Sequence, residues 1–546
     1  MKNKALKWIY NRCKGSIFIV VVMTLLGCLL SLISLAFVGA SKNLVNISTG
    51  QESGVWLDAA VVLVALLFSR LIVQIVINFL NVHASSRMEI GLKRYIFNNL
   101  LTKDFLSVSK YHSGELLNRL NSDVSVIVTG VIKILPSAAI FLTSIVGGFV
   151  YLYRIERTLA LIILAIGPLV AVGARLYSTK YKVLHKKCQE ADGKTKSFML
   201  EILQNLLVVK SFCNEEKILD RSEDLQRNSY KLRVRRTKVS VVAHVGMFLI
   251  FNAGYYFALA YGAYRISTGD INFGEFTAIL QLVNQIQTPF KDISALVPQF
   301  FSVIASAERL IELEGLESEP DEKMLENVGT VYDDMEEIVF EDVEFSYNSD
   351  SVVSGIDMRM KKGESVVIGG ESGAGKSTAI KLLLGIFEPD KGSIYIKTKT
   401  GKILVNKSTR PLFSYVPQGN LILSGTIREN ICFASGEASE EDIIKSAKVA
   451  QIWDFIDGLE EGLDTVIGEK GLGLSEGQAQ RISIARAILY DAPILLLDES
   501  TSALDSATEA ELLKAIAEMT DKTCIIISHK QAAFDMCDHV EYVNKK

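Results

Sequence analysis

Long apolar runs occupy the first part of the chain and constrain its fold more than any other feature. The run Ser16–Val38 holds 23 residues without a charge, and as a helix it would cross a bilayer core of about 30 Å. Five further runs are mostly apolar: Val55–Leu80, Leu135–Tyr153, Leu159–Ala174, Val239–Tyr264 and Phe276–Ile304. Because backbone polar groups in lipid must be paired within a segment, the runs predict an α-helical transmembrane domain with six spans over residues 1–310.

The charges divide the chain into two halves. Residues 1–310 hold 35 Lys and Arg against 19 Asp and Glu, and the remaining residues hold 23 against 43. Basic residues collect in the first 15 residues and in the predicted loop 175–238, which predicts that these segments and both termini lie on the cytoplasmic side of the cell membrane. The basic excess is therefore explained by the lipid bilayer as partner, and no nucleic-acid partner is expected.

Some predicted spans carry polar residues on one helical face. Arg70, Gln74 and Asn78 recur every four residues in the second span. A similar stripe in the sixth span consists of Gln281, Asn284 and Gln285. Polar residues at membrane depth line a hydrated cavity or hold helices together by hydrogen bonds. The cavity is favoured for Arg70, because an unpaired guanidinium in lipid is costly, and the two interpretations stay open for the sixth span.

A phosphate-binding pattern follows an acid-rich linker, residues 311–337. The residues Gly370-Glu371-Ser372-Gly373-Ala374-Gly375-Lys376-Ser377-Thr378 fit GxxxxGK[ST], between a β-type segment and an apolar helical segment. In this context the glycines let backbone N–H groups surround phosphates, Lys376 reaches the β- and γ-phosphates, and Ser377 holds Mg²⁺. We therefore expect an α/β P-loop NTPase domain over residues 338–546.

Two carboxylates follow a second buried strand. The four apolar residues of Ile494–Leu497 are typical of a parallel strand covered on both faces, and Asp498 and Glu499 come directly after them. Asp498 is a candidate ligand of Mg²⁺, and Glu499 a candidate base that orients and deprotonates the attacking water. The pair predicts an enzyme that hydrolyses ATP with Mg²⁺.

With these features the chain resembles an ATP-binding cassette (ABC) transporter of the exporter type, over nearly its full length. The segment Leu474-Ser475-Glu476-Gly477-Gln478 resembles the family signature LSGGQ, and Ser502-Ala503-Leu504-Asp505 resembles the D-loop, with Asp505 as its acid. The resemblance implies that Gln418 is the Q-loop glutamine and a further Mg²⁺ ligand. It also implies that His529 is the switch histidine of catalysis and that Tyr347 stacks on adenine.

Other segments are similar to the parts that join the two domains in this family. Gly468-Glu469-Lys470-Gly471 resembles the X-loop, and Gly114–Leu116 and Val209–Phe212 resemble the two intracellular coupling regions. The signature departs from the family pattern, since Glu476 stands where glycine is usual and Ala479 where a basic residue commonly follows. A carboxylate at this place either repels the nucleotide or points away from it.

The resemblance implies ATP-driven export or flipping of a substrate by alternating access, in a dimer of half-transporters. Because one chain has one cassette, the expected partner is a second copy of itself, with a related half-transporter as the alternative. The substrate is expected to be a small molecule, lipid, peptide or drug-like amphiphile. The competing hypothesis is an ATP-gated channel or regulatory membrane protein on the same scaffold, which would not need the catalytic Glu499.

Overall fold

The computed structural model describes residues 2–347, 350–371, 373–419, 422–468, 471, 473–519 and 521–543. Within these ranges, the side chains of residues 2, 164, 166–179, 182, 243–244, 291, 293–295, 297 and 350–351 lie outside the description. Ser372 of the phosphate-binding pattern and Glu469 and Lys470 of the X-loop segment also lie outside it. The chain divides into a helical unit, residues 1–101 and 111–315, and an α/β unit, residues 102–110 and 316–546.

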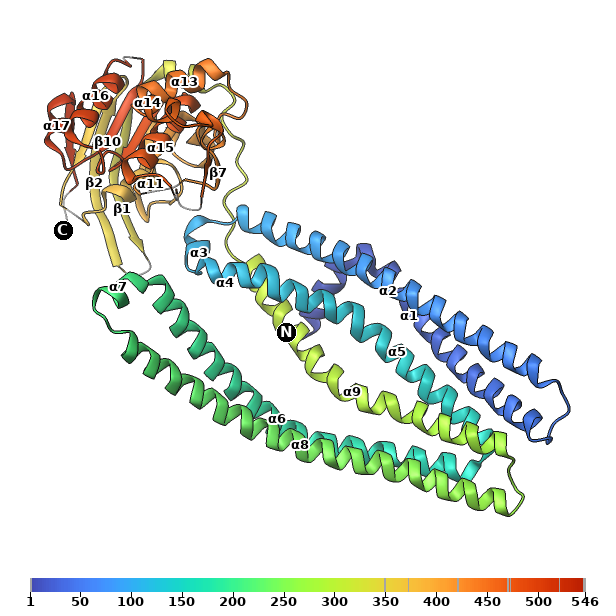
Figure 1. Ribbon diagram of the computed structural model, residues 1–546. Helices are drawn as coiled ribbons and strands as arrows, with labels where there is room; N and C mark the ends of the chain where they lie inside the picture. Colours follow the sequence, from blue (N-terminus) through green and yellow to red (C-terminus); the bar gives the residue numbers. More distant parts are fainter. Residues whose placement is uncertain are drawn as a thin grey trace. The chain divides into compact units, whose positions relative to one another are not determined.

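Long helices make up the helical unit, and each is much longer than a membrane crossing requires. They are α1 (Lys2–Ser48), α2 (Trp56–Leu101), α5 (Val124–Ile155), α6 (Arg157–Gln204), α8 (Glu215–Ser267) and α9 (Phe273–Glu314), with the short helices α4 (Ser113–Asn118) and α7 (Leu206–Ser211). At 1.5 Å per residue, α2 with its 46 residues is about 70 Å long. In this unit α1 packs on α2, α5 and α9, and α6 runs beside α8 (Figure 1).

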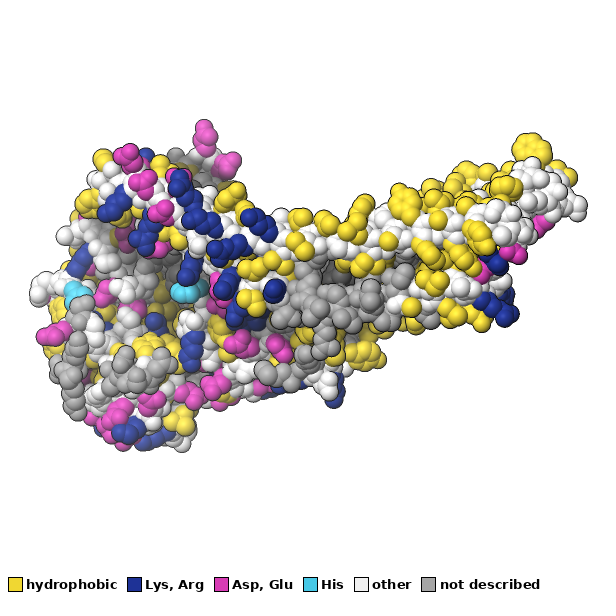
Figure 2. Space-filling view, turned by 90° about the horizontal axis from the view of Figure 1, so that it is seen from below, with side chains coloured by type: hydrophobic (Ala, Val, Ile, Leu, Met, Phe, Trp, Pro, Cys, Tyr) yellow, Lys and Arg dark blue, Asp and Glu magenta, His cyan; other side chains and the backbone are white. Residues whose placement is uncertain are grey.

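The surface of the helical unit is apolar over much of its length. Figure 2 shows hydrophobic side chains gathered over one face of these helices. Four helical segments among the described residues are long and apolar enough to span a membrane, and they contain the first, second, third and fifth predicted spans. The fourth and sixth predicted spans fall in α6 and α9, and several of their side chains lie outside the description.

A π-helical turn, η1 (Arg119–Asp123), joins α4 to α5. The apolar spacing of Leu116, Leu117, Leu120 and Val124 predicts a helix, and this segment is helical. Within it, Leu117 is exposed, and Arg119 and Asp123 are buried. Asp123 accepts hydrogen bonds from Ser306 and Arg309 of α9, so charged pairs rather than leucines hold this segment.

The α/β unit is built around two sheets. A parallel sheet has the strand order β11-β3-β10-β9-β6, an antiparallel sheet has the order β2-β1-β4-β5, and β7 pairs with β8. The strands are β1 (Met335–Tyr347), β2 (Asp350–Lys361), β3 (Ser365–Gly369), β4 (Lys391–Thr398), β5 (Gly401–Leu404), β6 (Phe413–Val416), β7 (Gly425–Thr426), β8 (Val466–Ile467), β9 (Ile494–Asp498), β10 (Thr523–Ile527) and β11 (His539–Tyr542).

The helices of the α/β unit pack on these strands or on one another. They are α3 (Phe105–Ser109), α10 (Val328–Asp334), α11 (Lys376–Leu383), α12 (Ile427–Ile431), α13 (Glu440–Val449), α14 (Trp453–Asp457), α15 (Glu476–Tyr490), α16 (Ser506–Ala517) and α17 (Gln531–Met536), with the 3₁₀ turns η2 (Lys407–Leu412) and η3 (Gly462–Asp464). Within the predicted linker, residues 311–337, the chain ends α9, forms α10 and begins β1. The buried strand predicted at Ile494–Leu497 is present as β9.

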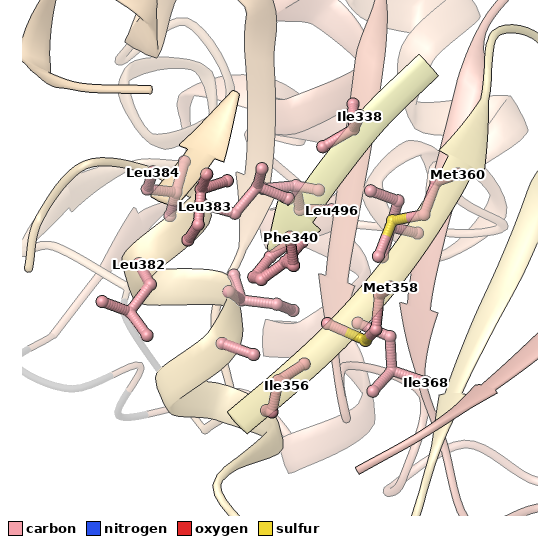
Figure 3. Close-up of a cluster of buried hydrophobic side chains, with 14 of the residues drawn as sticks. Ile338, Phe340, Ile356, Met358, Met360, Ile368, Leu382, Leu383, Leu384 and Leu496 are labelled. Atoms are coloured by element: carbon pink, nitrogen blue, oxygen red, sulfur yellow. The ribbon is translucent and has the colours of Figure 1, made fainter. Parts of the chain in front are cut away.

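One apolar core joins the two sheets. Phe340 of β1 and Met358 of β2 face Leu383 of α11 and Leu496 of β9 (Figure 3). Each is almost fully buried. Burial of a side chain of this size contributes about 1.5–3 kcal/mol, so this cluster fixes the antiparallel sheet and α11 against the parallel strands. The phosphate-binding segment, which begins α11, is positioned by the same core.

Candidate functional site

Four neighbouring strands of the parallel sheet bring the predicted catalytic segments to one edge. Strands β3, β10, β9 and β6 are neighbours in that order, and Ile527 is level with both Ile368 and Asp498. In a parallel sheet all carboxyl ends lie on the same side, which is where such sheets bind ligands. The segments that follow these four strands carry Gly370–Thr378, His529, Glu499 and Gln418.

At two positions of the phosphate-binding segment, both the backbone conformation and the lack of space require glycine. Gly370 and Gly375 have φ of +141° and +95°, in the region that side-chain-bearing residues rarely adopt. A Cβ atom on Gly370 would lie 2.3 Å from the Val543 carbonyl oxygen, and one on Gly375 would lie 2.9 Å from that of Val352. The loop therefore approaches neighbouring backbone closely, and its end begins α11, whose N-terminal N–H groups attract anions.

Lys376 is buried at the start of α11. Its Nζ donates to the carbonyl oxygens of Gly370 at 2.8 Å and Glu371 at 3.0 Å, and lies 3.1 Å from Nε2 of His529. Burial lowers the pKa of this ammonium, while the carboxylates of Glu499 and Asp498 act to raise it. A cation held among carbonyl groups and next to the glycine loop is suited to binding phosphate.

Asp498 is a buried carboxylate that receives hydrogen bonds from two hydroxyls. Ser377 Oγ donates to Oδ1 at 2.9 Å, and the Tyr415 hydroxyl donates to Oδ2 at 3.3 Å. Burial raises the pKa of Asp498, and the two hydrogen bonds act to lower it. A hydroxyl and a carboxylate side by side are oxygen ligands of the kind that Mg²⁺ accepts, so the residues present fit this ion. Sequence reasoning did not single out Tyr415, although it lies in the same strand as the segment leading to Gln418.

Glu499 lies between two other predicted catalytic residues. Its Oε2 accepts a hydrogen bond of 2.6 Å from Gln418, and its Oε1 lies 3.4 Å from His529 Nε2. Its backbone has φ of +49°, which non-glycine residues rarely adopt. The structure thus brings Gln418, Glu499, His529 and Lys376 into one connected group.

The predicted adenine-stacking residue, Tyr347, ends β1. Its ring meets Phe345 and Phe387 edge to face, with centroids 5.1 and 5.5 Å apart. Phe387 also contacts Phe105 of α3, at 6.2 Å between centroids, and Leu106 packs on the same core. The first expected coupling region, Gly114–Leu116, lies in the helical unit, whereas the segment 102–110, a few residues before it, belongs to the α/β unit. In the second expected coupling region, Val209 lies in α7 of the helical unit.

The signature segment begins α15. Ser475 caps the helix by accepting from the Gln478 N–H, and Gln478 accepts in return from the Ser475 N–H. Gly477 lies close to the next motif, since a Cβ on it would be 3.0 Å from the Ala503 carbonyl oxygen. Glu476 is exposed in the first turn, Leu474 is half-buried, and Ala479 is buried in the core. Asp505 caps α16 through hydrogen bonds from the N–H groups of Ala507 and Thr508.

The candidate cavity residues of the helical unit do not form a common cluster. Arg70, Gln74 and Asn78 are exposed on α2, and Gln74 donates to Asn78 of the same helix at 3.1 Å. In the sixth predicted span, Gln281 donates to Ser41 of α1 at 3.1 Å, as expected of a bond between helices. Asn284 is exposed and Gln285 is half-buried. The spacing overlooked Gln287, which is 4% exposed and whose Nε2 has no hydrogen-bond partner among the described residues.

Comparisons with known proteins agree with this architecture. Residues 17–290 match the family model for the ABC transporter transmembrane region, and residues 353–502 match a second family model, described as ABC transporter. The chain is 30% identical to ABC transporter B family member 1 of Dictyostelium discoideum over 85% of its own length, but it spans only 51% of that protein. It is also 30% identical to the ATP-dependent lipid A-core flippase of Desulfotalea psychrophila, over 80% of this chain and 77% of the flippase.

A solved structure of a bacterial Atm1-family ABC exporter with ATP bound is similar over almost the whole fold. The TM-score is 0.80 at 25% sequence identity, and the match covers 97% of this chain and 93% of the exporter. The membrane helices, the phosphate-binding edge of the sheet and these relatives lead to one conclusion. The chain belongs to the ABC transporter family as a multi-pass membrane protein of the exporter type, which binds ATP and couples its hydrolysis to transport.

Proposed function

We propose that this chain is a half-transporter that works as a homodimer in the cytoplasmic membrane and moves an amphiphilic lipid-like substrate from the inner side outward. The observation that supports it most is the connected group at the sheet edge, in which Glu499 contacts both Gln418 and His529. A chain that only gates a channel on ATP binding would not need a carboxylate held in this way. The basic N-terminal residues support cytoplasmic termini.

In the proposed mechanism, the N–H groups of Gly370–Thr378 and the Lys376 ammonium bind the phosphates of ATP, and Tyr347 stacks on the base. Glu499 orients the attacking water and accepts its proton, while His529 and Gln418 hold the carboxylate and sense the γ-phosphate. Ser377, Asp498 and Gln418 would hold Mg²⁺, which when bound neutralises charge on the phosphate oxygens.

The position of the signature segment supports the proposed dimer. Within one chain, the capping bonds and close contacts of Leu474–Gln478 run to its own helix and to Ala503, and Glu476 faces solvent. We propose that this segment binds the ATP held by the second copy. Retention of both Glu499 and His529 supports two identical sites. Purified chain expressed alone should therefore be a dimer with ATPase activity, and a monomer without activity would refute the homodimer in favour of a related partner.

Glu476 then lies close to a nucleotide phosphate in the dimer. A carboxylate at that place weakens ATP binding through an exposed, screened repulsion of about 1 kcal/mol or less. Glu476→Gly should lower the KM for ATP by up to about five-fold, a factor that corresponds to 1 kcal/mol. An unchanged KM would mean that the side chain points away from the nucleotide.

A lipid-like substrate is supported by the flippase relative and by the exposed face of α2, where Arg70 stands among apolar residues. A guanidinium in apolar surroundings is suited to an anionic head group. The test is reconstitution in vesicles with fluorescent phospholipids of anionic and zwitterionic head groups, followed by a quencher that reports which leaflet holds the dye.

Transport should require ATP and should be lost in Glu499→Gln, because that variant cannot deprotonate water. If Glu499→Gln moved substrate as fast as the native chain, the ATP-gated channel would be the better description. If no lipid moved although ATP was hydrolysed, a peptide or drug-like substrate would replace the lipid proposal.

A further inference from the structure

The turn that follows Glu499, residues 500–504, contains the first three residues of the D-loop segment and is held on two sides. Glu499 has a left-handed backbone with φ of +49°, and such a conformation persists only where the surrounding structure holds it. The Glu499 N–H donates to the Ile527 carbonyl oxygen at 3.0 Å, which fixes the start of the turn. The position of the Glu499 carboxylate therefore depends on what holds residues 500–504.

The side chain of Lys530 holds both ends of this turn. Its Nζ donates to the carbonyl oxygens of Thr501 and Leu504, each at 2.9 Å, and lies 3.1 Å from Oε2 of Glu509. An ammonium has three donors, so all three are used.

Glu509 is the carboxylate that completes this contact. It is 1% exposed, and its Oε1 accepts a hydrogen bond of 2.7 Å from the Thr501 hydroxyl. The turn, Lys530 and Glu509 thus form one saturated polar cluster. Each member loses partners if another is removed.

Gln480 of α15 holds the middle of the turn from the opposite side. It is 2% exposed, its Oε1 accepts from the Ala503 N–H at 3.1 Å, and its Nε2 donates to Ser502 Oγ at 3.2 Å. With the middle fixed by Gln480, the remaining freedom of the turn lies at its two ends, where Lys530 binds. Lys530 also directly follows His529, so the same anchor restricts His529 as well as the turn that positions Glu499, and these two side chains contact each other.

We infer that Lys530, together with Glu509, is a positioning residue for ATP hydrolysis that acts through Glu499 and His529. The inference rests on the proposed role of Glu499. Lys530 does not touch the phosphate-binding loop in any of its hydrogen bonds among the described residues, so its loss should affect the rate of the chemical step rather than the binding of ATP.

The test compares kcat and KM for ATP in the full-length protein. Lys530→Met should lower kcat by about 10- to 100-fold, the effect of small misplacement of a catalytic group, with KM changed by less than about two-fold. Lys530→Arg keeps the charge and several donors and should restore much of the rate. A merely structural lysine would not separate kcat from KM in this way.

Lys522 provides a matched control. Its Nζ also binds a backbone carbonyl, that of Ala492 at 2.8 Å, and a carboxylate, that of Asp491 at 2.8 Å. Lys522 and Asp491 precede β10 and β9, so they lie at the end of the strands away from the site. Lys522→Met should therefore leave kcat close to the native value, and an equal fall in both variants would show a general loss of stability and overturn the inference.

Two further measurements keep the outcomes distinct. If Glu499→Gln abolishes hydrolysis and Lys530→Met does not lower kcat, the positioning role is wrong while the role of Glu499 stands. If Glu499→Gln keeps its ATPase activity, the proposed role of Glu499 is wrong and the inference falls with it.

If Lys530→Met does not fold, Glu509→Gln replaces it as the test variant. The glutamine side chain keeps the shape of the glutamate side chain and removes its charge. An unchanged kcat in a folded Glu509→Gln would overturn the inference.

Discussion

Two buried aspartates, one in each unit, show how differently the two parts of this chain use charge. Asp123 of the helical unit is 3% exposed and pairs with Arg309, whose Nε donates at 2.8 Å, and with Ser306 at 2.9 Å. Asp498 of the α/β unit is 1% exposed and is bound by two hydroxyls, and none of the described residues offers it a salt bridge.

This difference in partners distinguishes a charge that stabilises the fold from a charge that is suited to binding a ligand. A buried carboxylate with its own cation is a complete interaction, and losing either partner destabilises the fold. A buried carboxylate without a salt bridge is costly, and burial raises the pKa of Asp498. Such a cost is typical of sites that a ligand completes. By this criterion, Asp123 holds helices together, and Asp498 fits the nucleotide site that we propose.

The largest expected effect is on the structural pair. Asp123→Ala should destabilise the folded protein by about 3 kcal/mol, at the low end for buried pairs because the Arg309 side chain is 47% exposed and can be hydrated. The measurement is thermal unfolding of the full-length protein in one detergent. Lys323→Ala breaks the exposed pair with Glu326 and should cost less than about 0.5 kcal/mol. Equal shifts of the unfolding temperature in the two variants would contradict the structural role of Asp123.

The next effect is on nucleotide binding. Lys376→Ala removes a charge-assisted contact with phosphate, worth about 2 kcal/mol, so the Kd for ATP should rise about 30-fold. Binding of a fluorescent ATP analogue reports this directly. Lys362→Ala serves as the control, because the Lys362 Nζ donates to the Asp333 carbonyl oxygen and not to the phosphate-binding segment. A Kd unaffected by Lys376→Ala would contradict the assignment of the phosphate site.

A smaller effect is expected from the hydroxyl that binds Asp498. Tyr415→Phe removes one of its two hydrogen bonds, worth about 1 kcal/mol, and should raise the Mg²⁺ concentration for half-maximal ATPase about five-fold. ATP binding measured without Mg²⁺ should stay the same. Tyr395→Phe, in the antiparallel sheet, is the control. If both variants changed the Mg²⁺ dependence equally, Tyr415 would have no special relation to Asp498.

The smallest effect concerns the exposed stripe of α2. Arg70→Ala should reduce substrate-stimulated ATPase by about two-fold and leave basal ATPase nearly unchanged, because an exposed guanidinium contributes about 1 kcal/mol or less. Stimulation curves with the anionic phospholipid measure both rates in one preparation. An equal fall in basal and stimulated rates would refute contact between Arg70 and the substrate.

Much of the α/β site could be predicted because its residues are tied to strand ends. The segments before Gly370 and before Asp498 have the sequence pattern of buried strands. Because all parallel strands of a sheet end at one edge, these local patterns predict that Lys376 and Glu499 lie close together. In the helical unit, the spacing of Arg70, Gln74 and Asn78 predicts a shared face and nothing about what that face meets. The burial of Arg119 and Asp123 in place of Leu117 could not be predicted, since a π turn shifts the helical face and leaves no pattern in the sequence.

The membrane helices, the order of the motifs and the nucleotide chemistry could all be inferred from the sequence. These depend on short-range properties, namely apolar length, glycine at left-handed positions and charge next to a strand. The side chains that hold those motifs in place can be identified only in the folded structure. Lys530 reaches Thr501 and Gln480 reaches Ala503 across more than 20 residues of chain. Such contacts arise from the packing of β9, β10 and α15 against each other, and the spacing of residues along the chain carries no record of them.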